Sequence, residues 1–455
     1  MRRNIWLPSL LALAVVGSAV GIGSAIAGKS CYTTTADAQM VGLNDWQEHP
    51  VFTVDETVDG YTPPGILDGI GALKWNRGTI RVLVNHELTS SVGYAYTLAS
   101  GASLTGARVS YFDIDRKTLE VCGAGPAYDT IYNRAGDEVE SSADLEFGGL
   151  NRLCSSALFE KNTFGFKDDV YFTGEETGGG TEFVLDVRGE ALWAAPAMGR
   201  AAWENVTALD TGNKDTVAIL VGDDRGGAPL LLYVGEKQPG NDFLARNGLA
   251  KGSLYVWVAG NGDLSPEDWN GTGTARAGQF VEIDYYRPDL AGNGDYDDLG
   301  YATQSHQDDL AAAAGAFRFS RPEDVATNPE DGTVAVLAST GRSSLFPSDS
   351  WGTIYTVDVD FSDLSCDLTI VYDGDDAGDG YFADPDYGIR SPDNLDWADD
   401  GQIYINEDRS VGGFGLTSGE EASIWRLDPD FPISNDIERV AQIDRSATLP
   451  GGQTD

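Results

Sequence analysis

Short apolar runs recur along the chain on a fixed plan, and each run ends in polar or acidic residues. In the segment Phe319–Thr340, a charged entry leads through Asp331-Gly332 into the apolar run Thr333–Ala338. Asp-Gly before a β-branched run indicates a hairpin. Similar runs end in carboxylates at Ile80–Glu87, Val170–Glu176, Val217–Asp224 and Ile403–Asp408. Repeated units of a few strands predict an all-β fold, a β-propeller, with a β-sandwich as the alternative.

The plan is interrupted between residues 236 and 316, where we expect loop and helix insertions. This region contains strand patterns at Ser253–Val258 and Gln279–Tyr285 and a helix pattern at Gln307–Ala314. No Pro/Ser-rich linker divides the chain, so we expect residues 28–455 to form one propeller domain. N-terminal strands, with Val51–Val58 as a candidate, are expected to complete the last blade.

The charge balance is strongly acidic, with 72 Asp and Glu against 30 Lys and Arg and a formal net charge of −42. Nucleic acids and anionic membranes need a basic surface, so neither is an expected partner. The acids indicate either a solvated surface suited to salty water or carboxylates that bind divalent cations. Asp295-Tyr296-Asp297 hints at a calcium loop, but it lacks EF-hand spacing, which favours a solvated loop.

The N-terminus has the pattern of a targeting segment. Arg2-Arg3 precedes the apolar run Ile5–Ile26, and Ala25-Ile26-Ala27 is typical of a cleavage site. We therefore predict a signal peptide over residues 1–27, with a retained membrane anchor as the alternative. The mature protein is expected to be periplasmic or secreted, free of the membrane and monomeric.

The four cysteines are Cys31, Cys122, Cys154 and Cys366. Disulfides are the default in an exported protein, and four cysteines allow three pairings. Cys154 occupies the repeat position that holds an acid in other repeats. It is therefore the cysteine least expected to be a structural disulfide.

Circular repetition would bring the ends of equivalent strands to one face, where they would form a metal site. The strand ends supply Glu87, Glu175, Glu176, Asp223, Asp224, Glu407 and Asp408, and the repeat starts supply Cys154, Glu204, Glu323 and Asp393. Clustered carboxylates repel one another, so cations are the expected compensation. Oxygen donors suit calcium, and a thiolate beside carboxylates also suits iron.

Arg321 is a cation among these acids. Its planar fork suits an oxyanion such as phosphate, and metals plus arginine would stabilise the charge of a cleaved phosphate ester. The alternative is that Arg321 pairs with Glu323 or a neighbouring acid and holds the blade together.

Seven motifs resemble those of the PhoX-type alkaline phosphatases, and they follow the family's order. They are Val84-Asn85-His86-Glu87, Asn151-x-x-Cys154, Thr173-Gly174-Glu175-Glu176, Met198-Gly199-Arg200-x-x-Trp203-Glu204, Gly222-Asp223-Asp224, Arg321-Pro322-Glu323 and Pro392-Asp393-Asn394-Leu395. The chain departs from the pattern at Ser155-Ser156, at Trp203 in place of histidine and at Asp324 in place of an aromatic residue.

The resemblance implies a six-bladed propeller with iron and calcium at one end of its axis. It implies Cys154, Glu204, Glu323 and Asp393 as iron ligands, and Glu87, Glu176 and neighbouring carboxylates (Glu175, Asp223, Asp408) as calcium ligands. It also implies that Arg321 contacts the substrate phosphate.

The predicted function is therefore that of an exported metal-dependent alkaline phosphatase acting on small phosphate monoesters. Two alternatives are a calcium-stabilised propeller that binds ligands without catalysis, and a related metal-dependent phosphodiesterase or lactonase.

Overall fold

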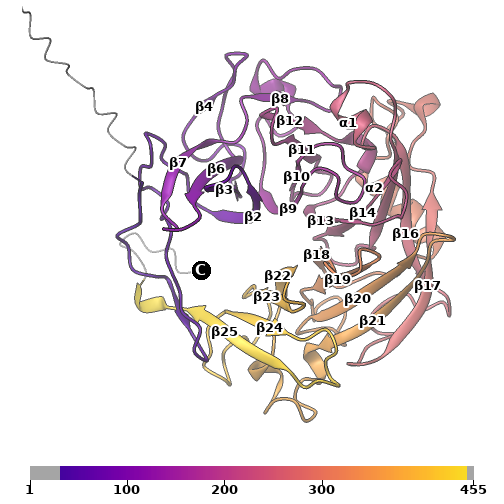
Figure 1. Cartoon of the computed structure of the whole chain (residues 1–455). Helices are drawn as coiled ribbons and strands as arrows, with labels where there is room; N and C mark the ends of the chain where they lie inside the picture. Colours follow the sequence, from indigo (N-terminus) through magenta and orange to yellow (C-terminus); the bar gives the residue numbers. More distant parts are fainter. Residues whose placement is uncertain (1–30, 448–455) are drawn as a thin grey trace, which may run out of the picture.

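The computed structural model describes residues 31–447, so the predicted signal peptide lies outside it. In this range, five antiparallel units of four strands surround a common axis (Figure 1), which confirms the propeller fold. No helix in the described part of the chain is long and apolar enough to cross a membrane.

The five blades follow one another along the chain. Blade one contains β2 (Leu67–Lys74), β3 (Thr79–His86), β6 (Arg108–Asp115) and β7 (Val121–Pro126). Blade two contains β9 (Leu153–Phe159), β10 (Val170–Glu175), β11 (Glu182–Asp186) and β12 (Ala191–Ala194), with β8 (Thr130–Tyr132) added at its edge. Blade three contains β13 (Trp203–Leu209), β14 (Thr216–Asp223), β15 (Leu231–Glu236) and β16 (Gly252–Ala259). Blade four contains β18 (Pro322–Thr327), β19 (Val334–Ser339), β20 (Thr353–Asp360) and β21 (Ser365–Asp373). Blade five contains β22 (Pro392–Trp397), β23 (Ile403–Glu407), β24 (Ser423–Leu427) and β25 (Ile437–Ile443).

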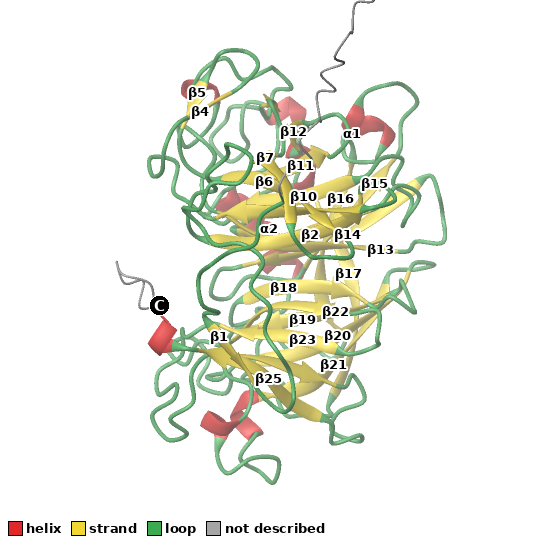
Figure 2. Cartoon of the chain, turned by 60° about the vertical axis from the view of Figure 1, so that its left-hand side comes forward, coloured by secondary structure: helices red, strands yellow, loops and turns green. Residues whose placement is uncertain are grey.

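A few elements lie outside this scheme. They are β1 (Met40–Gly42), β4 (Tyr96–Thr97), β5 (Ser103–Leu104), β17 (Ala275–Ile283), α1 (Phe243–Arg246) and α2 (Gln304–Ala314). Short 3₁₀ helices occupy Ser142–Asp144, Pro196–Met198, Pro288–Leu290, Gly374–Asp376, Pro385–Tyr387 and Arg445–Ala447. Figure 2 shows the strands stacked through the molecule, with the few short helices among the loops.

The implied count of six blades is not confirmed, because residues 31–447 form five. Figure 1 shows no sheet between blade one and blade five. Instead, the segment that joins β1 to β2 crosses this side of the ring.

The region between residues 236 and 316 belongs to the propeller more closely than the sequence indicates. The predicted strand at Ser253–Val258 is the outer strand β16 of blade three. The predicted strand at Gln279–Tyr285 is β17, which pairs with both β16 and β21 and joins blades three and four into one nine-stranded sheet. The predicted helix is α2. The Asp297 carboxylate accepts a hydrogen bond from Arg134 at 2.7 Å, so this loop is held by an ion pair.

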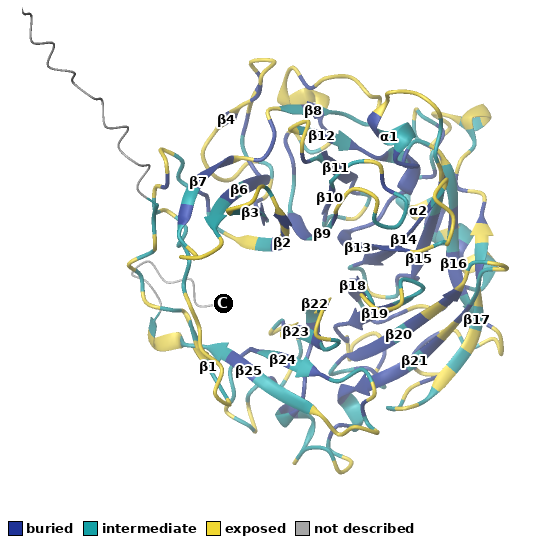
Figure 3. Ribbon diagram, viewed as in Figure 1, coloured by how far each residue is buried: buried dark blue, intermediate teal, exposed yellow. Residues whose placement is uncertain are grey.

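Apolar side chains fill the spaces between neighbouring blades. Leu83 and Tyr171 share the core between blades one and two, and Phe172 and Val217 share the next. Similar cores lie between blades three and four and between blades four and five. Figure 3 shows buried residues along the strands and exposed residues in the surrounding loops. Because the middle strands are covered on both faces, they read as continuous apolar runs.

The N-terminal segment ties blade one to blade five. Cys31 forms a disulfide with Cys122 in β7, and Tyr32 pairs with Val121. β1 then pairs with β25 as a fifth, outermost strand of the last blade, which confirms that an N-terminal strand joins this blade. The strand itself is Met40–Gly42; the expectation at Val51–Val58 is wrong, because only Val58 forms a bridge there, with Tyr61.

Removing the Cys31–Cys122 disulfide is expected to destabilise the protein. The bond closes a loop with a sequence separation of 91 residues. Removing a native disulfide typically lowers the free energy of unfolding by about 2–5 kcal/mol, and a loop of this size places the expected loss in the upper part of that range. Denaturant unfolding of the C31S/C122S double variant measures it. Reductant should lower the wild-type midpoint toward the variant's and leave the variant unchanged; equal midpoints without reductant would contradict the prediction.

Candidate metal and anion site

The first strand of every blade begins with the same irregularity. In β13, Trp203 pairs with Asp223 and Val206 pairs with Val221, so three steps on one strand match two on the other. The same register shift occurs at the start of β2, β9, β18 and β22. A β-bulge re-aims the side chains at its position. These five strands pack side by side around the axis, and we call them the inner strands.

The second residue of each inner strand lies in this bulge. These residues are Asp68, Cys154, Glu204, Glu323 and Asp393. Ligand atoms of Asp68, Cys154 and Glu204 lie within 4.8 Å of one another, as do those of Glu204, Glu323 and Asp393. The Cys154 Sγ donates to Glu204 Oε1 at 3.2 Å. Four of these five residues were predicted, and the structure brings all five together.

A second set of side chains comes from the residue directly after the second strand of each blade. These residues are Glu87, Glu176, Asp224, Thr340 and Asp408. Glu87 and Glu176 cluster with Cys154, and Glu176 and Asp224 cluster with Glu204, again within 4.8 Å. The Thr340 hydroxyl donates to Glu323 Oε1 at 2.7 Å. Asp408 lies close enough to raise the pKa of Asp393, after the larger effect of burial.

Glu175 and Asp223, which were also predicted as ligands, are not in these clusters. Side chains alternate along a strand, so the residue before Glu176 or Asp224 points the other way. Glu175 accepts the backbone N–H groups of Asn151 at 3.1 Å and Thr181 at 3.3 Å. Asp223 accepts the backbone N–H of Ala202 at 2.9 Å and pairs with Arg225 at 2.6 Å. Both carboxylates therefore hold the start of an inner strand.

Asp68 was not among the predicted residues, and Asp224 was named as a strand-end acid without being assigned as a ligand. Asp68 stands at the same repeat position as Cys154 and Glu204, and this equivalence is the sequence signal from which it could have been predicted. Asp224 follows Asp223, and only the register of the strand decides which of the two faces the axis.

Two arginines precede inner strands and contact these acids. Arg321 Nε and Nη2 donate to the two Asp224 oxygens at 2.7 and 2.9 Å, and Nη2 also lies 2.8 Å from Glu323. Its Nη1 donates to the Ser410 hydroxyl at 3.2 Å. Arg152 contacts Glu87 at 2.8 Å and also Glu176. The structure thus shows the ion pairs considered as the alternative role of Arg321, and they orient its guanidinium.

Burial makes the clustered acids difficult to ionise together. Burial, followed by the charge of Glu87, raises the pKa of Asp68 to about 7. Burial raises the pKa of Glu176 to about 8 although Arg152 opposes it. Burial also raises the pKa values of Glu204 and Glu323 well above their ordinary range, with neighbouring carboxylates adding to the shift. Cations bound here would therefore displace protons.

Asp224 is the exception. Burial opposes its ionisation, but the hydrogen bonds and charge of Arg321 hold the pKa of Asp224 below its ordinary value. The ion pair between Arg321 and Asp224 is therefore intact over the range in which Asp68 and Glu176 titrate.

The donor set fits metal ions. One thiol and several carboxylates converge, and Asp68 Oδ1 is buried without a hydrogen-bond partner in the described part of the chain. Carboxylate oxygens are the donors that calcium prefers, and a thiolate adds a donor suited to iron.

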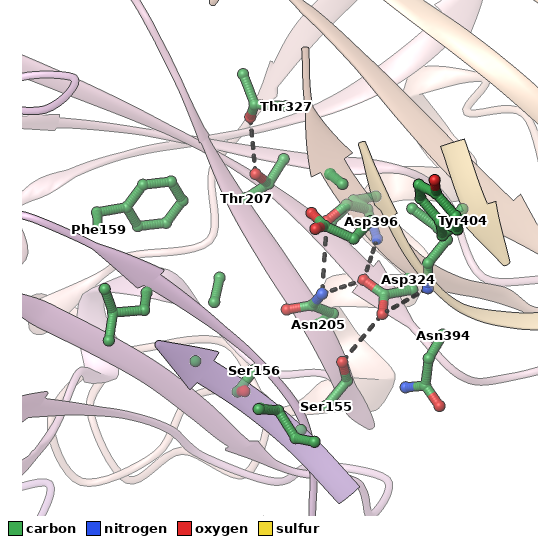
Figure 4. Close-up of a pocket in the computed structure, with 18 of the residues that line it drawn as sticks. Ser155, Ser156, Phe159, Asn205, Thr207, Asp324, Thr327, Asn394, Asp396 and Tyr404 are labelled. Carbon is green, nitrogen blue, oxygen red and sulfur yellow. Dashed lines mark hydrogen bonds between the residues drawn. The ribbon is translucent and has the colours of Figure 1, made fainter. Parts of the chain in front are cut away.

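Asp324 connects four inner strands directly beneath these clusters. It is the third residue of β18 and lines a cavity of 830 Å³ along the axis (Figure 4). Its Oδ2 accepts the Ser155 hydroxyl of β9 at 3.0 Å and the Leu395 N–H of β22 at 3.1 Å. Its Oδ1 accepts the Asn205 amide of β13. Each of these strands carries one of the clustered ligands.

The Asp324→Asn variant is expected to lose stability and metal affinity. An amide has one acceptor oxygen, so at least one of the three donors loses its partner, at about 1–3 kcal/mol. Denaturant unfolding and metal titration measure both effects. Asp396→Asn makes the same change in the same cavity and is the matched control. Equal behaviour of the two variants would contradict the role of Asp324 as a link between strands.

The fold and the site together define a propeller with clustered carboxylates and one thiol at one end of its inner strands. The family described as "Alkaline phosphatase PhoX" matches residues 191–428, more than half of the chain. The chain belongs to this family.

Two solved structures are similar in fold. Pseudomonas fluorescens PhoX in complex with vanadate, a transition state analogue, has a TM-score of 0.57 and 17% identity over 83% of this chain and 79% of that one. The soluble aldose sugar dehydrogenase of Escherichia coli, in the apo form, has a TM-score of 0.32 and 13% identity over 81% of this chain and 87% of that one, too low to support an inference. None of the curated proteins matches the chain.

Proposed function

We propose that the protein is an exported, metal-dependent alkaline phosphatase that hydrolyses small phosphate monoesters. One observation carries the proposal: the inner strands bring several carboxylates, one thiol and Arg321 together at one end of the axis. Membership of the PhoX family supports it.

In this proposal four of the five second residues of the inner strands hold iron, while the strand-end acids and the fifth second residue, Asp68, hold calcium. Cys154, Glu204, Glu323 and Asp393 would be the iron ligands, and Glu87, Glu176, Asp224 and Asp68 the calcium ligands. When bound, such ions supply positive charge that polarises phosphoryl oxygens and stabilises a leaving oxygen.

The chain itself supplies the orientation of the substrate. Asp224 and Glu323 hold two nitrogens of Arg321, so its remaining nitrogen, Nη1, is directed to Ser410. A phosphate oxygen can take the place of the Ser410 hydroxyl as the acceptor. Thr340 holds the Glu323 oxygen that Arg321 also contacts, which keeps ligand and arginine in one geometry.

Hydrolysis of p-nitrophenyl phosphate by the full-length protein, together with metal analysis, tests the proposal. Activity should disappear in chelator and return with calcium. Bound calcium without turnover would favour a binding module. Hydrolysis of bis-p-nitrophenyl phosphate or a lactone, but not of the monoester, would indicate a related hydrolase.

Export, to the periplasm or the medium, is part of the proposal. The signal-peptide pattern of residues 1–27 supports it, and the Cys31–Cys122 disulfide is typical of an oxidising compartment. N-terminal sequencing of the mature protein should begin at Gly28; an intact N-terminus would contradict cleavage.

A further inference from the structure

A polar pocket of 320 Å³ lies beside Arg321. It is formed where the chain leaves β19 and β23, the strands whose ends supply Thr340 and Asp408. Its main lining residues are Arg321, Arg342, Ser343, Ser344, Ser350 and Ser410. Arg321 lines this pocket and also pairs with Asp224 and Glu323 of the ligand clusters, so the pocket borders the proposed phosphate position.

The pocket differs from the rest of the site in its charge. No carboxylate of residues 31–447 lines it, whereas the neighbouring clusters consist mainly of acids. Arg342 is exposed and forms no ion pair with any residue in the range 31–447, while Arg321 is already paired with Asp224 and Glu323. A free guanidinium among serine hydroxyls is a donor-rich surface suited to an anion.

The loop that carries Arg342 has a defined shape. The Arg342 N–H donates to the Asp349 carbonyl at 2.9 Å, and the Arg342 carbonyl accepts from Leu345 and Phe346, each at 2.9 Å. Phe346 is buried. At Gly341, φ is +91° and a Cβ would lie 2.6 Å from the Gly352 nitrogen, so the loop starts in close contact with neighbouring backbone. Arg342 is therefore presented by an ordered loop.

We propose that this pocket binds the leaving group of the substrate and that Arg342 selects phosphomonoesters whose leaving group carries a carboxylate. The inference rests on the proposed phosphatase function. In the reaction, a water oxygen bonds to phosphorus, the ester P–O bond breaks and the leaving alkoxide takes a proton from water. With the phosphate at Arg321, a small leaving group reaches the serines and Arg342 in the same pocket.

The test compares 3-phosphoglycerate with glycerol 3-phosphate, which share a carbon skeleton and differ by a carboxylate in place of a hydroxymethyl group. We expect kcat/KM of the metal-loaded wild type to favour 3-phosphoglycerate by about tenfold, the effect of one charge-assisted contact. In Arg342→Gln this ratio should fall close to one. Arg116→Gln, an exposed arginine in a turn of blade one, should keep the wild-type ratio.

Calorimetric binding of the same two esters separates this inference from the proposed function. If neither ester is turned over but the wild type binds 3-phosphoglycerate more tightly and Arg342→Gln does not, the pocket assignment stands and the phosphatase proposal fails. If the wild type shows no preference in turnover or binding, or Arg342→Gln keeps the preference, the pocket assignment is overturned.

Discussion

The Arg321→Ala variant is expected to lower kcat/KM for phosphate monoesters by about a hundredfold to a thousandfold, the usual effect of removing an oriented donor from a developing anion. Two guanidinium nitrogens of Arg321 are fixed by Asp224 and Glu323. The third nitrogen, Nη1, faces Ser410 in the polar pocket. Inhibition by inorganic phosphate should weaken as well. Steady-state kinetics with p-nitrophenyl phosphate measure both effects.

Arg321 also balances buried acids, so the measurement must separate binding from structure. The side chain of Asp224 is 9% exposed and that of Glu323 is 1% exposed, and both lose a cation in the variant. Arg321→Lys keeps the positive charge but loses the planar, bidentate guanidinium. Compared with Arg321→Ala, it should therefore recover metal content more than catalytic activity. Arg276→Ala breaks an Arg–Asp pair, with Asp263, on the outer strand β17 and serves as the control. Wild-type kinetics in Arg321→Ala would remove this residue from the site.

The Cys154→Ser variant is expected to lose at least about nine-tenths of its iron, since a hydroxyl is a much weaker ligand than a thiolate. Cys154 is buried, and burial followed by the charges of Glu204 and Asp68 raises the pKa of its thiol well above the ordinary value. A bound cation is therefore what would favour the thiolate. Serine can keep the hydrogen bond to Glu204, so the free energy of unfolding should change by less than about 1 kcal/mol.

Cys366→Ser provides a matched control for Cys154→Ser. Cys366 is the other free thiol in the described chain, and it lies in the apolar core between blades three and four. Its replacement should lower stability and leave the metal content unchanged. Metal analysis of both variants gives the comparison. Full iron content in Cys154→Ser would contradict the assigned ligand.

Much of the architecture could be predicted from the pattern of residues. Hairpins with Asp-Gly turns and apolar runs indicated repeated blades, and the ordered motifs indicated the family. The strand patterns at Ser253–Val258 and Gln279–Tyr285 were also correct. The position of these strands in the fold was not predicted. β17 joins two blades by pairing with residues about ninety positions away in the chain. A single sequence contains no signal for such pairing.

The residues of the candidate site likewise fall into those that the sequence predicts and those that only the structure decides. The repeat positions of Cys154, Glu204, Glu323 and Asp393 could be found by comparing one repeat with the next. The choice between Glu175 and Glu176 could not, because it depends on strand register and on a bulge. The disulfide pairing of Cys31 and the links made by Asp324 likewise depend on which strands become neighbours.

The sequence by itself determined the strand-and-turn repeat, the family and the chemical types gathered at the repeat ends, because periodicity and residue type are local properties. Only the tertiary structure decided the five blades seen in residues 31–447, the acids that face the axis and the partners of Arg321. The physical reason is that these features arise from contacts between segments far apart in the chain, where pleat, bulge and burial select one orientation for each side chain.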